Sequence, residues 1–221
     1  AIFAGGTPVC ERQPCYLSVL TESNAMSRIS KIPVEQWDPE LVAMTAGDTA
    51  TVIEQGITRM LAHSPEMAKG AIGFGASIAM NRTLPERLIE LVRLRVAFHN
   101  QCRSCMAIRY SSAADVVDEE LVCSLEKPQE AADLTAAERA AIDVADRFAT
   151  DHLSITDARF AALREYFTEA QVMELLLNLA LYVGMGRLAA TLDMTEELPE
   201  AFQAKFGETV TPWGKAPLNV R

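Results

Sequence analysis

The residues best suited to chemistry are two cysteines three positions apart, Cys102 and Cys105, in the segment Cys-Arg-Ser-Cys. Cysteines at this spacing can close a disulfide, supply half of a metal site, or pack as small buried residues. A zinc site needs about four ligands. Once Cys10 and Cys15 are discounted as part of the N-terminal segment 1–25, the sequence has no second cysteine pair, and it has no histidine-rich segment. We therefore expect no metal and no cofactor, and the pair favours redox chemistry.

The position of each thiol on its helix predicts its reactivity. A helix that begins at Cys102 places this thiol among unpaired backbone N–H groups, where a thiolate is favoured. Cys105 follows one turn later and can close a disulfide with an oxidised Cys102. Arg103 and Arg109 add positive charge to the segment. On the residues alone, Cys102 is the expected attacking thiol.

A single carboxylate, Glu90, lies on the apolar helix that we predict over residues 86–99, directly before the pair. Burial raises the proton affinity of a carboxyl group, and such a group can transfer protons near neutral pH. The alternative is an ion pair with Arg93 or Arg87 on the same helix face, which is the commoner arrangement for a lone glutamate.

Helix formers dominate the elements that must position these side chains. Strand signals are nearly absent, so we predict an all-α protein of about eight helices. Two capping boxes, at Thr135 and Thr168, mark helix starts, and Pro65 marks a third. The expected helices cover about 49–61, 65–80, 86–99, a segment from 102, 118–124, 135–150, a segment from 156, and 168–192.

We expect one domain over residues 26–195, followed by a proline-containing tail over 196–221. The residues Ser23-Asn24-Ala25 before Met26 resemble a remnant of cloning, so residues 1–25 are expected to be foreign to the native protein. The alternative is a genuine N-terminal extension.

Composition excludes several classes of partner. The formal net charge is −10 and no Lys/Arg run interrupts it, so we expect no nucleic acid and no anionic membrane surface as a partner. The longest nearly unbroken apolar run, Leu175 to Met185, is too short to span a bilayer. Without a secretion signal, a cytoplasmic and reducing location is the expectation.

Two predicted helices, 86–99 and 169–192, carry apolar residues on nearly every side. A helix of this kind is normally buried, and a domain of this size rarely buries two of them alone. We therefore expect a homo-oligomer whose interface covers part of these helices.

The sequence from Leu84 to Ala97, followed by Asn100 and the Cys102-x-x-Cys105 pair, resembles the carboxymuconolactone decarboxylase-like superfamily. It is most similar to the alkylhydroperoxidase, or AhpD-type, branch, which has a glutamate twelve residues before the first cysteine, as Glu90 is here. The similarity covers roughly residues 30–195. It implies an AhpD-like all-helical fold and homo-oligomers, commonly trimers or hexamers.

The resemblance also implies a thiol peroxidase. In that scheme Cys105 attacks a hydroperoxide and becomes a sulfenic acid, Cys102 resolves it as a disulfide, and a dithiol donor restores both thiols. Glu90 joins a proton relay that activates the thiol. This order of the two thiols is the reverse of the order expected from the residues alone.

The sequence departs from the AhpD pattern at both relay histidines. The branch has one histidine between the cysteines and another four residues after the second, where this chain has Ser104 and Arg109. His99 is a candidate substitute, although a histidine at a helix end commonly caps carbonyl groups. Arg109 offers positive charge and Tyr110 a hydroxyl group.

These departures leave two alternatives open. One is a lyase or decarboxylase that acts on a small lactone or carboxylic acid, with the arginines near Glu90 as its anion site. The other is a non-catalytic helical oligomer whose cysteine pair is inert or senses redox state.

Overall fold

The computed structural model describes residues 27–203 and 208–221. Within them it has ten α-helices and one two-stranded sheet, so the predicted all-α class is confirmed. The helices are α1 (Pro39–Thr45), α2 (Val52–Gln55), α3 (Thr58–Leu61), α4 (Pro65–Met80), α5 (Glu86–Asn100), α6 (Arg103–Ala107), α7 (Glu119–Cys123), α8 (Ala136–Thr150), α9 (Asp157–Arg164) and α10 (Glu169–Leu192). The strands are β1 (Ile108–Tyr110) and β2 (Leu218–Val220). The segment 1–25 lies outside the described residues.

Helix starts follow the local signals in the sequence. The capping boxes at Thr135 and Thr168 are both formed, and Pro65 is the first residue of α4. The single helix predicted over 49–61 is wrong, because Gly56 adopts φ +44° and separates α2 from α3. A positive φ interrupts a right-handed helix, and glycine adopts it at little cost.

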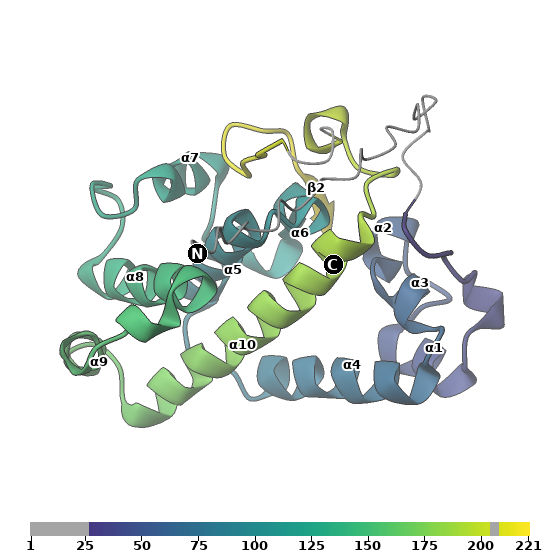
Figure 1. Ribbon diagram of the computed structural model, residues 1–221, viewed down its shortest axis with the longest axis horizontal. Helices are drawn as coiled ribbons and strands as arrows, with labels where there is room; N and C mark the ends of the chain where they lie inside the picture. The colour runs from purple at the N-terminus through teal and green to yellow at the C-terminus, as the bar shows by residue number, and fades with distance from the viewer. Residues whose placement is uncertain (1–26, 204–207) are drawn as a thin grey trace, which may run out of the picture.

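The main core surrounds α5, which packs against α8 and α10. Leu91, Val92 and Leu94 of α5 have no exposed surface. In Figure 1, α10 crosses the molecule diagonally, with α8 and α9 on one side and α1–α4 on the other. The central helix α5 thus carries Glu90 into the interior.

Helix α10 is long and apolar enough to cross a membrane, by length and composition only. Of its apolar 18-residue window, 28% is buried. In this fold α10 packs against α4, α5, α6, α8 and α9. It leaves Met173, Leu177 and Leu188 exposed. The cytoplasmic location stays a prediction.

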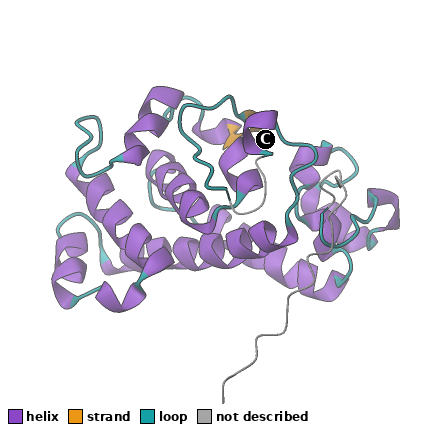
Figure 2. Cartoon of the chain, turned by 45° about the horizontal axis from the view of Figure 1, so that its top comes forward, coloured by secondary structure: helices purple, strands orange, loops and turns teal. Residues whose placement is uncertain are grey.

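The end of the chain packs beside the cysteine pair. Strand β2 pairs in parallel with β1, with Ile108 opposite Leu218 and Tyr110 opposite Val220, and Figure 2 shows both strands in orange among the helices. The Trp213 ring lies 4.8 Å from that of Phe98. Residues 208–221 belong to the segment that we predicted to be a tail. Through these contacts they pack against the chain that follows Cys105 and fix its position.

Candidate active site at the cysteine pair

A break between two helices positions the cysteines. Helix α5 ends at Asn100, Gln101 adopts the left-handed conformation with φ +50°, and Cys102 is the N-cap of α6. The Cys105 N–H donates to the Cys102 Sγ at 3.3 Å. The predicted break after the apolar helix is therefore confirmed.

The two sulfur atoms have different surroundings. Cys102 and Cys105 form a disulfide. Cys102 has no exposed surface, and the Ser104 hydroxyl lies 3.5 Å from its sulfur. Cys105 is half-buried and lines a cavity. A molecule that enters this cavity meets Cys105 and not Cys102.

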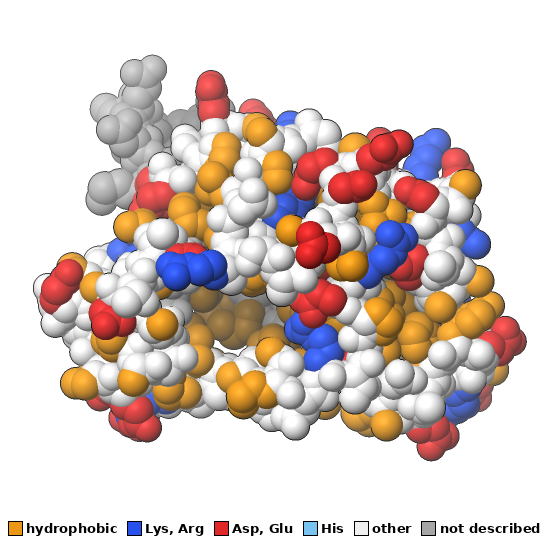
Figure 3. Space-filling view, turned by 180° about the vertical axis from the view of Figure 1, so that it is seen from behind, with side chains coloured by type: hydrophobic (Ala, Val, Ile, Leu, Met, Phe, Trp, Pro, Cys, Tyr) orange, Lys and Arg blue, Asp and Glu red, His pale blue; other side chains and the backbone are white. Residues whose placement is uncertain are grey.

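The cavity has a volume of about 460 Å³. Its walls come from α2 and α3, from α4, from α5 through Arg93 and Ala97, from α6 and β1, and from α10 with the residues that follow it. Apolar side chains make up most of the wall, among them Ile53, Ile57, Ile72, Leu181 and Met185. Figure 3 shows the surface hollowed on the face seen from behind, with hydrophobic side chains in the hollow. Such a cavity suits an apolar small molecule.

One end of the cavity carries a charged cluster. The buried Arg59 donates to both carboxylate oxygens of Glu197, at 2.8 and 3.3 Å. Lys31 binds the same carboxylate at 2.8 Å. The hydrogen bond from Arg59 is the main reason that the pKa of Glu197 falls to about 2. This ion pair ties α3 to the chain after α10.

Glu90 forms an ion pair with Arg93 in the interior. The Arg93 guanidinium donates to both Glu90 carboxylate oxygens, at 2.6 and 2.7 Å, and both residues are buried. Burial alone would lower the pKa of Arg93, but the attraction of Glu90 outweighs it and the pKa is raised. Of the two arrangements expected for Glu90, the ion pair is the one formed.

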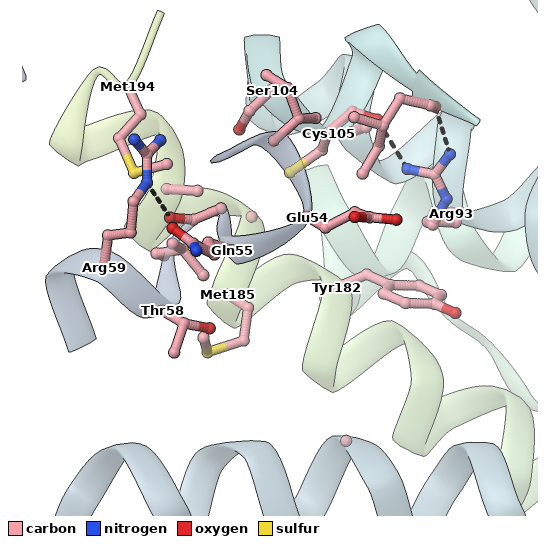
Figure 4. Close-up of a pocket in the computed structure, with 18 of the residues that line it drawn as sticks. Glu54, Gln55, Thr58, Arg59, Arg93, Ser104, Cys105, Tyr182, Met185 and Met194 are labelled. Atoms are coloured by element: carbon pink, nitrogen blue, oxygen red, sulfur yellow. Dashed lines mark hydrogen bonds between the residues drawn. The ribbon is translucent and has the colours of Figure 1, made fainter. Parts of the chain in front are cut away.

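Arg93 connects this ion pair to the cysteine segment. Its guanidinium also donates to the Cys105 carbonyl at 2.7 Å and to the Ile108 carbonyl at 3.0 Å, as Figure 4 shows. The same group lies 4.9 Å from the centre of the Tyr110 ring. Glu90 therefore reaches Cys105 through Arg93, at the backbone rather than at the sulfur.

Tyr182 of α10 is a cavity residue that the sequence did not single out. Burial raises its pKa to about 12, so the hydroxyl stays protonated at neutral pH. Figure 4 places Tyr182 and Met185 around the same open space as Cys105. The signal was a phenol within the mostly apolar stretch from Leu175 to Met185, because a buried hydroxyl normally serves a polar partner or a ligand.

His99 lies apart from the cavity wall. Its Nε2 atom lies 2.7 Å from an Asp146 carboxylate oxygen, which Arg95 also binds. Burial would raise the pKa of Asp146, but the hydrogen bonds from His99 and Arg95 outweigh it and lower the pKa. The structure therefore brings Cys102, Cys105 and Glu90 together through Arg93 and places His99 against α8.

Arg109, at the position of a relay histidine, is engaged elsewhere. It binds Glu119 at 2.8 Å and donates to the carbonyl groups of Met106, Ile108 and Pro212. It does not line the cavity. Its role in this fold is to fasten β1 to the C-terminal segment.

Within residues 27–203 and 208–221, no three side chains of His, Cys, Asp and Glu cluster as metal ligands would. Neither a protein-family model nor a curated protein matches the sequence.

Solved structures do match the fold. One is an uncharacterised peroxidase-related protein from Ralstonia eutropha JMP134, described as an alkylhydroperoxidase AhpD core, with 18% identity and a TM-score of 0.63 over 81% of this chain and 95% of that one. Another is a protein of unknown function from Agrobacterium tumefaciens, described as a candidate AhpD antioxidant-defence protein, with 20% identity and a TM-score of 0.56 over 63% and 97%.

A third is the debrominase Bmp8 in its apo form, with 18% identity and a TM-score of 0.61 over 78% of this chain and 94% of that one. At these identities the likeness establishes architecture. The chain has the AhpD-like fold that the residues around Glu90 and the cysteine pair predicted.

Proposed function

We propose that the protein is a thiol-dependent peroxidase, or a closely related thiol–disulfide oxidoreductase, that acts through Cys105 and Cys102. One observation carries the proposal: the accessible sulfur of a cysteine pair lies on the wall of a largely apolar cavity. The buried Cys102 is already within bonding distance of Cys105. An attacking thiol needs access, and a resolving thiol needs only proximity.

The chemistry balances with a hydroperoxide and a dithiol. The Cys105 thiolate attacks the terminal peroxide oxygen, the O–O bond breaks, and the alkoxide leaves and takes up a proton as the alcohol. The Cys105 sulfenic acid then condenses with the Cys102 thiol, which releases water and forms the disulfide. A dithiol donor reduces the disulfide by exchange at Cys105, the sulfur that the cavity exposes.

Glu90 acts in this proposal as a positioning residue. Both of its oxygens accept hydrogen bonds from Arg93, and Arg93 holds the Cys105 carbonyl. Charge-assisted bonds of this kind fix geometry firmly. The peptide that carries the reacting sulfur is therefore held from the side of α5.

Consumption of cumene hydroperoxide with dithiothreitol as donor tests the proposal. We expect Cys105→Ser to reduce turnover to the uncatalysed background. We expect Cys102→Ser to accumulate a sulfenic acid at Cys105, detected by mass spectrometry after dimedone labelling. Cys123→Ser, which replaces an exposed free cysteine, is the matched control and should behave as the wild type.

Two results would overturn the proposal or its assignment of roles. Wild-type turnover by Cys105→Ser would remove the peroxidase function. A dimedone adduct on Cys102 in the Cys105→Ser variant, with none on Cys105 in the Cys102→Ser variant, would reverse the two roles in favour of the order expected from the residues alone.

The lyase alternative receives less support from the site. Its anion site would be built from arginines near Glu90, and each of them is paired with a carboxylate: Arg87 with Glu138, Arg93 with Glu90, and Arg95 with Asp146. A substrate carboxylate would have to displace a side chain from a formed ion pair.

A second candidate is thiol-driven reduction of an apolar organic bromide. The accessible Cys105 in an apolar cavity supports it, because such a cavity accepts a halogenated ring as readily as an organic peroxide. The balance is one bromide and one dithiol giving the hydrogen-substituted product, hydrogen bromide and a disulfide. Release of bromide ion from bromophenols, measured in the same dithiothreitol assay, separates the two candidates.

A further inference from the structure

Two methionine thioethers share the cavity with Cys105. Met185 of α10 and Met194, which follows that helix, both line it, and Figure 4 shows their sulfur atoms near the labelled cavity residues. Met185 is half-buried and Met194 is 6% exposed. Neither residue is used by the cysteine chemistry.

The redox state of Cys105 determines which sulfur atom a bound oxidant can react with. In this structure Cys105 is part of the disulfide and has no thiol to offer. Among the described residues that line the cavity, the reduced sulfur atoms are then those of Met185 and Met194. A thioether is oxidised by peroxides, and its sulfoxide is polar.

We propose that Met185 is an oxidation site of the disulfide form, modified to the sulfoxide by an organic hydroperoxide that occupies the cavity. The inference rests on the proposed function for the identity of the oxidant. Met194 is the slower second site, because its side chain is almost fully buried.

The step needs no further reactant. The Met185 sulfur attacks the terminal oxygen of the hydroperoxide, the O–O bond breaks, and an S–O bond forms. The sulfur loses two electrons, the hydroperoxide is reduced to its alcohol, and the proton of the transferred oxygen passes to the departing alkoxide. Confinement in the cavity favours the reaction because it holds the two reactants together.

Oxidation of Met185 should lower the activity of the enzyme once the dithiol donor is exhausted. A sulfoxide oxygen on Met185 adds a polar group to a wall that otherwise consists mostly of apolar side chains. An apolar substrate then binds less well, because burying an unsatisfied polar group carries a cost. Excess hydroperoxide without donor should therefore inactivate the protein in a way that fresh dithiol alone does not reverse.

The chain supplies its own controls for the test. Met67 and Met80 on α4 are each 79% exposed, so oxidation that follows exposure alone must modify them first. The disulfide form is treated with cumene hydroperoxide or with hydrogen peroxide, and sulfoxide at each methionine is quantified by peptide mass spectrometry. We expect cumene hydroperoxide to oxidise Met185 several-fold faster than Met67 and Met80. With hydrogen peroxide, we expect the most exposed methionines to be oxidised first.

Oxidation of Met67 and Met80 ahead of Met185 by both peroxides would overturn the inference. A functional arm compares wild type and Met185→Leu, each with its own untreated activity, after hydroperoxide treatment and re-reduction by dithiothreitol. Loss of activity in the wild type and retention in Met185→Leu is expected, and equal loss in both would contradict the assigned consequence.

This outcome can be told apart from failure of the proposed function. If the reduced protein does not turn over hydroperoxide but Met185 is still oxidised first, the peroxidase proposal fails and the oxidation site stands. If turnover is efficient and the methionines follow exposure, only the oxidation site fails.

Discussion

At the scale of single residues, the buried pair of Glu90 and Arg93 holds the backbone of the cysteine segment, in a chain that lacks the relay histidines of the AhpD pattern. The glutamate keeps the arginine charge neutralised in the interior, and the arginine uses its remaining N–H groups on the carbonyls of Cys105 and Ile108. This ion pair therefore fixes the backbone of Cys105, whose sulfur is the proposed reacting atom.

Removal of one partner of this pair should be costly. Glu90→Gln leaves Arg93 buried with an uncompensated charge, and loss of one member of such a pair costs about 3–5 kcal/mol. We expect urea denaturation to show a drop of this order in the free energy of unfolding. Glu66→Gln is the control, because Glu66 pairs with Lys69 at a side chain that is 83% exposed, and exposed pairs contribute about 0–1 kcal/mol.

The same variant separates positioning from proton transfer. A Glu90→Gln protein that unfolds like the wild type yet turns over hydroperoxide slowly would show that Glu90 transfers protons, as the AhpD resemblance implies. If Glu90→Gln lowers both the free energy of unfolding and the rate of hydroperoxide turnover, the result supports the positioning role.

At the scale of elements, α10 crosses the end of α5 at a glycine. A Cβ atom on Gly186 would lie 2.5 Å from the Asn100 Nδ2, and Asn100 is held in place because that amide donates to the Tyr182 carbonyl at 2.9 Å. The end of α5 directly precedes Cys102. The close approach of the two helices therefore fixes where the cysteine segment begins.

Substitution at two helical glycines tests this crossing. Gly186→Ala forces atoms apart in a packed interface, which costs about 1–3 kcal/mol. Gly70→Ala, on α4, meets no atom within 4 Å, and alanine is the better helix former, so this variant should match or exceed the wild type by about 0.5–1 kcal/mol. Thermal and urea denaturation of both variants provides the measurement, and equal stability would refute the crossing as a constraint.

Local signals predicted most of the helices, and long-range contacts account for the missed strands. Two further misses were local, namely the break at Gly56 and helix α1, which Asp38 caps. A few neighbouring residues determine the caps at Thr135 and Thr168 and the break before Cys102. These features can therefore be recognised in the sequence. Strands β1 and β2 are three residues long and lie far apart in the chain. Three residues are too few for a recognisable alternation, and their pairing exists only once the chain has folded back.

The residues of the candidate site also fall into those that the sequence predicted and those that only the folded structure reveals. Cys102, Cys105 and Glu90 lie within one short stretch, and the cysteine spacing together with the resemblance to the AhpD-type branch singled them out. The cavity wall combines α5, α6 and β1 with the distant elements α2, α3, α4 and α10, so Met185 and Tyr182 belong to it only through tertiary packing. The engagement of His99 by Asp146 likewise depends on the contact of α5 with α8.

At the scale of the whole molecule, one face of α10 is apolar and uncovered. Met173, Leu177 and Leu188 are 56%, 39% and 38% exposed, and Ala180 and Gly184, also exposed, lie between them on the same helical face. An exposed apolar stripe along a helix is typical of an interaction site. The sequence led us to expect a homo-oligomer that covers such a surface, and we propose that this stripe forms its interface.

The mass of the protein in solution tests the proposed interface. We expect the wild-type protein to sediment as an oligomer, and Leu177→Glu to dissociate it, because the interface would have to bury an unpaired carboxylate. Leu153→Glu is the matched control, since Leu153 is 84% exposed and lies outside the stripe, so this variant should keep the wild-type mass. Analytical ultracentrifugation of the three proteins decides the matter. A monomeric wild type, or an oligomer unchanged by Leu177→Glu, would contradict the proposed interface, because burial of the stripe is what makes association favourable.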